Sequence, residues 1–173
     1  EEAPAMISAL KAMGIRPVMM TGDSYRTAKA VAERLGFEEF YAEVLPEDKA
    51  NFVQAVKADG KKVIMIGDGV NDSPALSASD AGIAMRDSSS LAQEISDITI
   101  SSNDLMSLVT LIEISQNLMK RIKFNYRTVT GFNGGLIALG FFALITPGTS
   151  ALLHNGSTLV LALNSMTPLL KER

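Results

Sequence analysis

Short apolar runs alternate with segments of helical spacing along the first hundred residues. The apolar runs predict strands at Arg16–Met20, Phe40–Val44, Lys62–Ile66, Ala81–Met85 and Asp97–Ile100. Helical spacing predicts helices at Pro4–Met13, Tyr25–Leu35 and Ser88–Ile95, and two more that open at Pro46 and Ser73. Such alternation indicates an α/β fold, with a parallel sheet covered by helices on both faces.

Local signals mark the ends of the predicted helices. Ser24 precedes the helix at 25–35 and can cap it, and Gly36 follows its last residue. Pro74 stands at an early position of the next short helix, where its missing N–H costs nothing. From Asn103 to Arg127 there is no Gly or Pro, so we expect one unbroken helix there.

The last part of the chain is apolar and free of Asp, Glu, Lys and Arg between Arg127 and Lys171. A bilayer core about 30 Å thick needs roughly 20 helical residues, so this stretch suffices for close to two crossings. The turn residues at 146–149 divide it into Thr128–Ile145 and Ser150–Leu170. We therefore expect a transmembrane helical hairpin at 128–170, after a helical stalk at 103–127 and an α/β part at 1–102. Two buried helices of a soluble core are the alternative.

Charge supports the division of the chain. The 16 basic and 19 acidic side chains give a net charge of −3, but residues 1–119 carry −8 and residues 120–173 carry +5. Basic residues flank the charge-free stretch on both sides, at Lys120, Arg121, Lys123, Arg127, Lys171 and Arg173. The positive-inside rule then places residues 1–127 and the C-terminus in the cytoplasm of an integral membrane protein. We expect the cell (plasma) membrane and contact with its lipid bilayer.

Composition excludes several classes of function. The sequence has no Cys and one His, which excludes disulfides, thiolate metal sites and a multi-histidine centre within these residues. The acidic first half argues against binding of nucleic acid, which needs clustered Lys and Arg. The sequence does not begin with Met, and we expect an N-terminal part of the same polypeptide to precede it.

Polar residues interrupt the second predicted span. His154, Asn155, Ser157 and Thr158 lie within five residues, and such groups are costly to bury in lipid without partners. They indicate an ion path, with His154, Ser157 and Thr158 as candidate ligands of a transported metal. The alternative is hydrogen bonding between helices, which hydroxyl side chains often provide in membranes. Asn133 in the first span is a weaker candidate ligand.

Acidic loops follow two of the predicted strands. Asp23 follows the strand at 16–20, and Asp68 and Asp72 follow the strand at 62–66. Sites in parallel sheets lie at the carboxyl ends of the strands. Mg²⁺ prefers carboxylate, phosphate and water oxygens, so Asp68 and Asp72 are candidate magnesium ligands. The glycines at 67 and 69 permit close approach of the backbone, and the next helix begins where an anion is favoured.

Further residues complete a candidate phosphoryl-transfer site. Thr21 and the N–H of Gly22 can hydrogen-bond phosphoryl oxygens, and Lys49 can neutralise developing charge. A nucleophile with an activating partner is missing from this set. The Gly-Asp-Gly-Val-Asn-Asp segment alone would also suit an ordinary turn, but the ordered combination of motifs favours a functional site.

The chain resembles the phosphorylation domain of a P-type ATPase in its ordered motifs. These are Met-Thr-Gly-Asp at 20–23, Pro-x-x-Lys at 46–49, Gly-Asp-Gly-Val-Asn-Asp-Ser-Pro-Ala-Leu at 67–76 and Asp-Ala-Gly-Ile-Ala-Met at 80–85. The Ser-Pro-Ala-Leu ending and two spans before a basic end are similar to the heavy-metal-transporting subgroup. The likeness extends over essentially the whole chain.

The resemblance implies a Rossmann-like haloacid dehalogenase-type fold in which ATP phosphorylates an Asp. It implies that Thr21, Gly22 and Lys49 contact the phosphoryl group and that Asp23 orders the nucleotide side. Asp68 would bind Mg²⁺, with Asn71 and Asp72 fixing the site. The phosphorylated Asp of the family lies in an Asp-Lys-Thr-Gly-Thr motif that this sequence lacks. The chain alone is therefore expected to be inactive, as one part of a metal-exporting pump.

The cargo is expected to be a divalent transition metal. The sequence His-Asn-Gly-Ser-Thr at 154–158 is similar to the last span of divalent-metal exporters, whereas copper transporters have Met in place of His154. Nitrogen and oxygen ligands suit divalent ions better than Cu⁺. Two other functions stay open: a membrane-anchored haloacid dehalogenase-like phosphatase with its own nucleophilic Asp upstream, and a non-catalytic binding protein.

Overall fold

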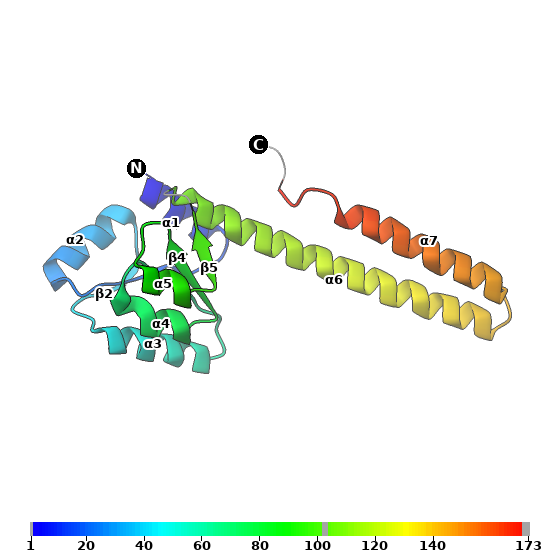
Figure 1. The fold of residues 1–173 in the computed structure, drawn as a ribbon, viewed down its shortest axis with the longest axis horizontal. Coiled ribbons are helices and arrows are strands. Elements are labelled where there is room, and N and C mark those ends of the chain that lie inside the picture. The colour runs from blue at the N-terminus through cyan, green and yellow to red at the C-terminus, as the bar shows by residue number, and fades with distance from the viewer. Residues whose placement is uncertain (1, 102–103, 171–173) are drawn as a thin grey trace. The chain divides into compact units, whose positions relative to one another are not determined.

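The computed structural model describes residues 2–101 and 104–170, which form two compact units, Glu1–Val109 and Thr110–Arg173. The strands are β1 (Val18–Met20), β2 (Glu39–Tyr41), β3 (Ile64–Gly67), β4 (Ala81–Met85) and β5 (Ile98–Ile100). The helices are α1 (Glu2–Ala12), α2 (Tyr25–Leu35), α3 (Pro46–Ala58), α4 (Ser73–Ala78), α5 (Ser90–Ile95), α6 (Met106–Phe141) and α7 (Pro147–Ser165), with the short 3-10 helix η1 (Val70–Asp72) (Figure 1).

All strand pairing in the described residues is parallel, which confirms the predicted α/β class. The strands form two sheets, one of β1 and β2 and one in the order β3–β4–β5. Val18 lies opposite Glu39 in the first sheet, and Ile64 lies opposite Ala81 in the second. The predicted parallel sheet is thus present in two parts in the residues described, because no backbone pairing joins β1 to β3.

The core lies where α4 packs against the central strand β4. Leu76 and Ile83 are 2% and 1% exposed, and Val53 of α3 is 2% exposed. A Cβ on Gly82 would lie 3.1 Å from the carbonyl oxygen of Leu76. The glycine therefore lets α4 and β4 approach closely, and this contact fixes the loop that joins β3 to α4.

Two aspartate side chains accept hydrogen bonds from the backbone at the starts of β3 and β4. The Asp97 carboxylate accepts a hydrogen bond from the Gly82 N–H at 2.8 Å. The Asp80 carboxylate accepts from the Val63 N–H at 3.0 Å and from the Lys62 ammonium at 2.9 Å. The bond from the Val63 N–H, and then the neighbouring Lys62, lower the pKa of Asp80. The carboxylates thus secure the edge of the second sheet opposite the candidate site.

Helix α2 ends as predicted but begins differently. Gly36 adopts a left-handed conformation at φ +84°, and its N–H bonds to the Ala32 carbonyl. Ser24 occupies the N-cap position, yet its hydroxyl pairs with the Thr27 hydroxyl at 3.1 Å and caps no backbone N–H. The prediction of a Ser24 side-chain cap is therefore wrong.

The second unit is a hairpin of two long helices. Helix α6 is continuous from Met106 to Phe141, as expected from the lack of Gly and Pro before Arg127, and α7 runs back beside it (Figure 1). The chain reverses over residues 142–146, where Ala143 has φ +56°. Pro147 begins α7, because Thr146 caps it by accepting from the Thr149 N–H at 3.2 Å. The predicted turn at 146–149 is thus the first turn of a helix.

Helix composition does not confirm the predicted transmembrane hairpin. Among the described residues, no helix is both long enough and apolar enough to cross a membrane. Helix α7 has sufficient length, but His154, Asn155 and Asn164 dilute its apolar content. Lys171 and Arg173, two of the predicted flanking charges, lie outside the described residues.

Candidate active site and a polar contact in the helical hairpin

The Thr-Gly-Asp segment forms a tight turn directly after β1. The Thr21 hydroxyl donates to the Asp23 carboxylate at 2.9 Å and accepts from the Asp23 N–H at 3.2 Å. Thr21 and Asp23 are both predicted site residues. Asp23 therefore orients the Thr21 hydroxyl, and the N–H of Gly22 stays without a hydrogen-bond partner among the described residues.

The loop after β2 holds this turn in place. The Thr21 carbonyl accepts from the Val44 N–H at 3.0 Å, and the Asp23 carbonyl accepts from the Glu43 N–H at 2.9 Å. Glu43 takes a left-handed conformation at φ +58°, which is uncommon for a residue other than glycine. Glu43 and Val44 are not among the predicted site residues, since nothing in their residue types signals this backbone contact.

Lys49 and Asp72 form the most enclosed ion pair in the described residues. The Lys49 ammonium donates to Oδ1 of Asp72 at 2.7 Å, and the two side chains are 13% and 12% exposed. Lys49 lies one turn into α3, which starts after Leu45, and Asp72 ends η1. The contact joins two predicted site residues that are far apart in sequence, and it gives Asp72, a predicted magnesium ligand, a lysine partner.

Gly67 permits this position of Asp72. A Cβ on Gly67 would lie 2.6 Å from Cβ of Asp72 and 3.1 Å from its Oδ2. Carbon atoms in contact are about 3.5–4.0 Å apart, so any side chain at position 67 would displace the aspartate. The close approach expected at Gly67 is made by the side chain of Asp72.

Asp68 presents an open carboxylate in the loop that leads from β3 to Asp72. It follows β3 directly, it is exposed, and its side chain has no hydrogen bond or ion pair among the residues described. Its backbone carbonyl accepts from the Ser89 N–H at 2.8 Å, which fixes the loop. Asn71 lies in η1 with an exposed side chain and no side-chain contact in the described residues.

The carboxylate oxygens of the site suit a hard cation that is bound partly by the protein and partly by a bound phosphate and water. Asp68 offers a free carboxylate, and Oδ2 of Asp72 makes no hydrogen bond within the described part of the chain. Those residues contain no group of three or more His, Cys, Asp or Glu side chains that could hold a metal ion by themselves. Mg²⁺ typically takes one or two carboxylates and completes its shell with phosphate and water oxygens. Helix α4 has six residues, so its dipole contributes little to binding of an anion at its N-terminus, contrary to the prediction.

A second group of polar side chains joins the helices of the hairpin. Nδ1 of His154 lies 2.9 Å from Oδ1 of Asn133, across from α7 to α6. The hydroxyls of Ser157 and Thr158 both donate to the His154 carbonyl, at 2.8 and 3.0 Å. These hydroxyl protons are therefore used within α7, and the helix-joining contact is the His154–Asn133 pair.

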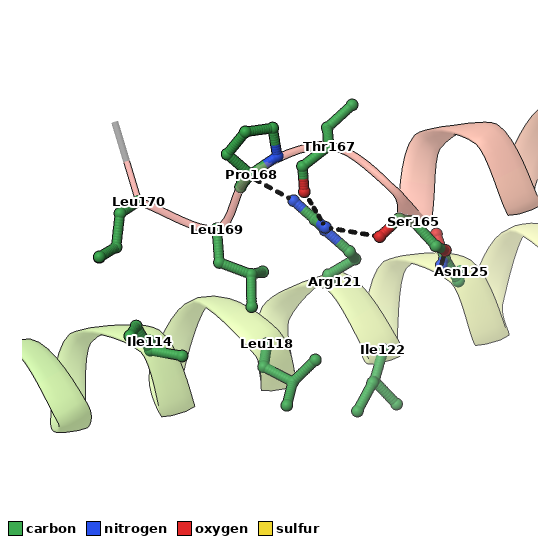
Figure 2. A pocket seen from close by; sticks show the side chains of 10 residues that line it. All are labelled: Ile114, Leu118, Arg121, Ile122, Asn125, Ser165, Thr167, Pro168, Leu169 and Leu170. Atoms are coloured by element: carbon green, nitrogen blue, oxygen red, sulfur yellow. Dashed lines mark hydrogen bonds between the residues drawn. The ribbon is translucent and has the colours of Figure 1, made fainter. Parts of the chain in front are cut away.

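Arg121 fastens the end of α7 to α6, a role that sequence analysis did not assign. Its guanidinium donates to the carbonyls of Ser165 and Thr167 at 3.0 and 2.6 Å and to that of Pro168 at 3.1 Å (Figure 2). Asn125 adds a bond to the Ser165 hydroxyl at 2.8 Å. The residues border an open, mainly apolar hollow of about 670 Å³. Arg121 satisfies carbonyls that have no partner at a helix C-terminus.

Comparison with known proteins first defines the class of the α/β part of the chain. Residues 1–80 match the haloacid dehalogenase-like hydrolase family. The parallel α/β arrangement and the loops after β1 and β3 agree with that class. The predicted Rossmann-like fold of haloacid dehalogenase type is thereby confirmed.

Longer relatives then identify the chain more closely. A cation-transporting ATPase of Oryza sativa subsp. japonica is 44% identical over 76% of the chain and 13% of that protein. A probable copper-transporting P-type ATPase B of Staphylococcus aureus is 33% identical over 99% of the chain and 26% of that protein. The crystal structure of a zinc-transporting PIB-type ATPase superposes with a TM-score of 0.89 and 33% identity, over 95% of this chain and 27% of that one.

The chain is thus homologous to one segment of the heavy-metal-transporting P-type ATPases, a segment that includes part of their phosphorylation domain. It spans about a quarter or less of the length of the relatives described above. The recognition made from the sequence motifs is confirmed at this level.

Proposed function

We propose that the chain is part of an ATP-driven pump that exports a divalent transition metal through an aspartyl-phosphate intermediate. The observation that carries this proposal is the Lys49–Asp72 pair of 2.7 Å, together with the open carboxylate of Asp68 in the loop that leads from β3 to Asp72. It puts one positive and two negative groups at the carboxyl end of β3, where sites of parallel sheets lie. Homology to metal-transporting ATPases supports the same reaction.

Each residue of the site has a defined task in phosphoryl transfer. Thr21 and the free N–H of Gly22 bind oxygens of the transferred group, and Asp23 orients Thr21 and the nucleotide side of the site. Lys49, held by Asp72, supplies fixed positive charge, which stabilises charge that develops on those oxygens. The nucleophilic Asp comes from a segment of the polypeptide outside this chain.

Asp68 and Asp72 would hold Mg²⁺, with the exposed amide of Asn71 beside them. The ion would neutralise phosphate charge when ATP is bound, as in phosphoryl-transfer enzymes generally. Asp68 is the principal ligand in this proposal, because Oδ1 of Asp72 is already occupied by Lys49.

The hairpin at 128–170 is proposed to lie in the lipid bilayer. Large apolar side chains point away from it along its length: Ile137 and Leu152 are 74% and 73% exposed, and Leu159 is 62% exposed. Meanwhile His154 and Asn133 bond to each other between the helices. Such an apolar exterior is rare on proteins in water and suits lipid or neighbouring spans. Residues 1–127 and the C-terminus would then face the cytoplasm.

A divalent cargo follows from the donor chemistry of the hairpin. Its one ionisable side chain in the charge-free stretch is His154, and its other polar groups are amides and hydroxyls. Imidazole and oxygen donors suit Mn²⁺, Fe²⁺, Co²⁺ or Zn²⁺, whereas Cu⁺ prefers sulfur. The relatives described above include copper and zinc transporters, so Cu⁺ is the competing cargo.

Phosphoenzyme formation by the intact pump tests the reaction. Replacement of Asp68 by Ala should reduce Mg²⁺-dependent labelling from [γ-³²P]ATP by at least a hundredfold, because it removes the open carboxylate. Asp59→Ala, at the exposed end of α3, is the matched control and should label normally. Normal labelling of Asp68→Ala would refute the assigned role.

The cargo is tested by ATPase activity of the intact pump with Mn²⁺, Fe²⁺, Co²⁺, Zn²⁺ and Cu⁺ in turn. One divalent ion should stimulate hydrolysis, and His154→Ala should weaken that stimulation without loss of fold. Stimulation by Cu⁺ alone would overturn the divalent assignment. Unchanged stimulation of His154→Ala would show that His154 only packs the helices.

A further inference from the structure

The contact between His154 and Asn133 determines which ring nitrogen of the histidine carries a proton. The amide oxygen Oδ1 of Asn133 has no hydrogen and can only accept. Nδ1 of His154, at 2.9 Å from it, must therefore be the donor. In a neutral imidazole the other nitrogen, Nε2, then carries a lone pair and no proton.

The remaining contacts leave Nε2 available. No hydrogen bond or ion pair of Nε2 exists among the described residues, and the ring is exposed on the surface of the hairpin. Asn133 is half-buried on α6, so the ring is held from its Nδ1 side by the neighbouring helix. The ring is thus anchored on one side and open on the other.

We propose that Asn133 is a positioning residue that keeps His154 in the Nδ1–H tautomer and thereby presents Nε2 to a divalent metal ion. This inference rests on the proposed transport function and assigns Asn133 a role different from that of a ligand. Metal-binding histidines usually donate their second ring N–H to a carbonyl or carboxylate, which fixes tautomer and orientation. The Asn133 amide oxygen supplies that acceptor.

The geometry also separates the roles of the neighbouring hydroxyls. Ser157 and Thr158, which lie about one turn after His154 on α7, both donate to the backbone carbonyl of His154. Their protons point back along their own helix, while the Asn133 bond comes from α6. His154 is then the nitrogen ligand of the hairpin, and its partners would be oxygen donors, because the described residues hold no group of three His, Cys, Asp or Glu side chains that could bind a metal ion.

The tautomer can be measured directly because the chain contains one histidine. The 173-residue chain, labelled with ¹⁵N-histidine in detergent micelles, should give one pair of imidazole signals, with Nδ1 protonated and Nε2 unprotonated. A wild-type ring protonated at Nε2 would overturn the proposal. This measurement needs no variant and no metal, so it stands apart from the success or failure of the transport function.

Substitution of Asn133 then tests the cause. Asn133→Leu should shift the ring toward the Nε2–H tautomer, whereas Asn133→Asp keeps an acceptor and should preserve Nδ1–H. Asn164→Leu, elsewhere on α7 and without a side-chain contact in the described residues, should leave the signals unchanged. An unaltered tautomer in Asn133→Leu would refute the positioning role.

Titration of the same labelled chain with Zn²⁺ tests whether Nε2 of His154 binds the metal. Zn²⁺ should move the Nε2 signal and leave Nδ1–H in place, and Asn133→Leu should weaken binding by at least tenfold. Asn133→Asp should restore it. A zinc-induced shift at Nδ1, or equal affinity of wild type and Asn133→Leu, would overturn the proposal even if the intact pump transports a divalent ion.

Discussion

The Lys49–Asp72 pair gives a quantitative test of how the candidate active site is held together. Its two side chains are 13% and 12% exposed, and the nitrogen–oxygen distance is 2.7 Å. Removal of one partner from a buried pair costs about 3–5 kcal/mol, because a charge is left without compensation. Some water still reaches this pair, so we expect about 2.5 kcal/mol for Lys49→Met and a similar loss for Asp72→Asn.

The double variant separates pairing from other effects. Lys49→Met combined with Asp72→Asn leaves no uncompensated charge, so we expect it to cost about 3 kcal/mol where the single losses add to about 5. The coupling free energy is then about 2 kcal/mol, or roughly thirtyfold in the unfolding equilibrium constant. Asn is close in shape to Asp and fits beside Gly67. Urea unfolding of the complete chain in detergent micelles, followed by circular dichroism, gives each value.

An exposed pair provides the matched control. Lys29 and Glu33 lie one turn apart on α2 at 3.9 Å, with side chains 53% and 69% exposed. Their cycle, Lys29→Met with Glu33→Gln, should give a coupling of at most about 0.5 kcal/mol, as is usual for surface pairs. If the coupling of Lys49 and Asp72 is no larger than this, the pair does not organise the site and the argument from enclosure is refuted.

Three further predictions concern other parts of the chain. Gly67→Ala should lower the free energy of unfolding by about 1–3 kcal/mol, measured by urea unfolding, because its Cβ would meet that of Asp72 at 2.6 Å. Arg121→Gln should raise amide hydrogen exchange at residues 165–170 about tenfold, since the guanidinium bonds to three carbonyls are lost. Asp80→Asn should lower the thermal midpoint at pH 7. Hydrogen bonding to the Val63 N–H and to Lys62 lowers the pKa of Asp80 in the folded chain, so its stabilisation is present above about pH 4 and is lost as the pH falls through the lower, folded value.

Each of these predictions has a control close by. Gly69→Ala should be tolerated better than Gly67→Ala, since its Cβ would find no atom nearer than 3.8 Å. Lys123→Gln, on α6 near Arg121, should leave exchange at 165–170 unchanged. Asp59→Asn should leave the thermal midpoint at pH 7 unchanged. An equal effect in a variant and its control would contradict the role given to the corresponding contact. A difference in thermal midpoint between Asp80→Asn and wild type that persists at low pH would do the same.

The sequence by itself determined the class of fold and predicted the residues of the candidate active site. Apolar runs of the length of a strand alternate with helical spacing, and turn residues such as Gly36 mark the boundaries because only certain backbone angles suit them. The loops with Thr21 and Asp68 follow strands of a parallel sheet, so their placement at the carboxyl ends follows from chain direction alone. The continuity of α6 followed in the same way from the absence of Gly and Pro.

Only the tertiary structure decided which side chains meet. Lys49 and Asp72 are 23 positions apart, and their 2.7 Å contact depends on how α3 packs beside η1, which residue types cannot specify. The same holds for His154 and Asn133, whose pairing depends on the register between α6 and α7. Local patterns fix helices and strands because those depend on neighbours in sequence, whereas the tautomer of His154 and the partner of Asp72 depend on neighbours in space.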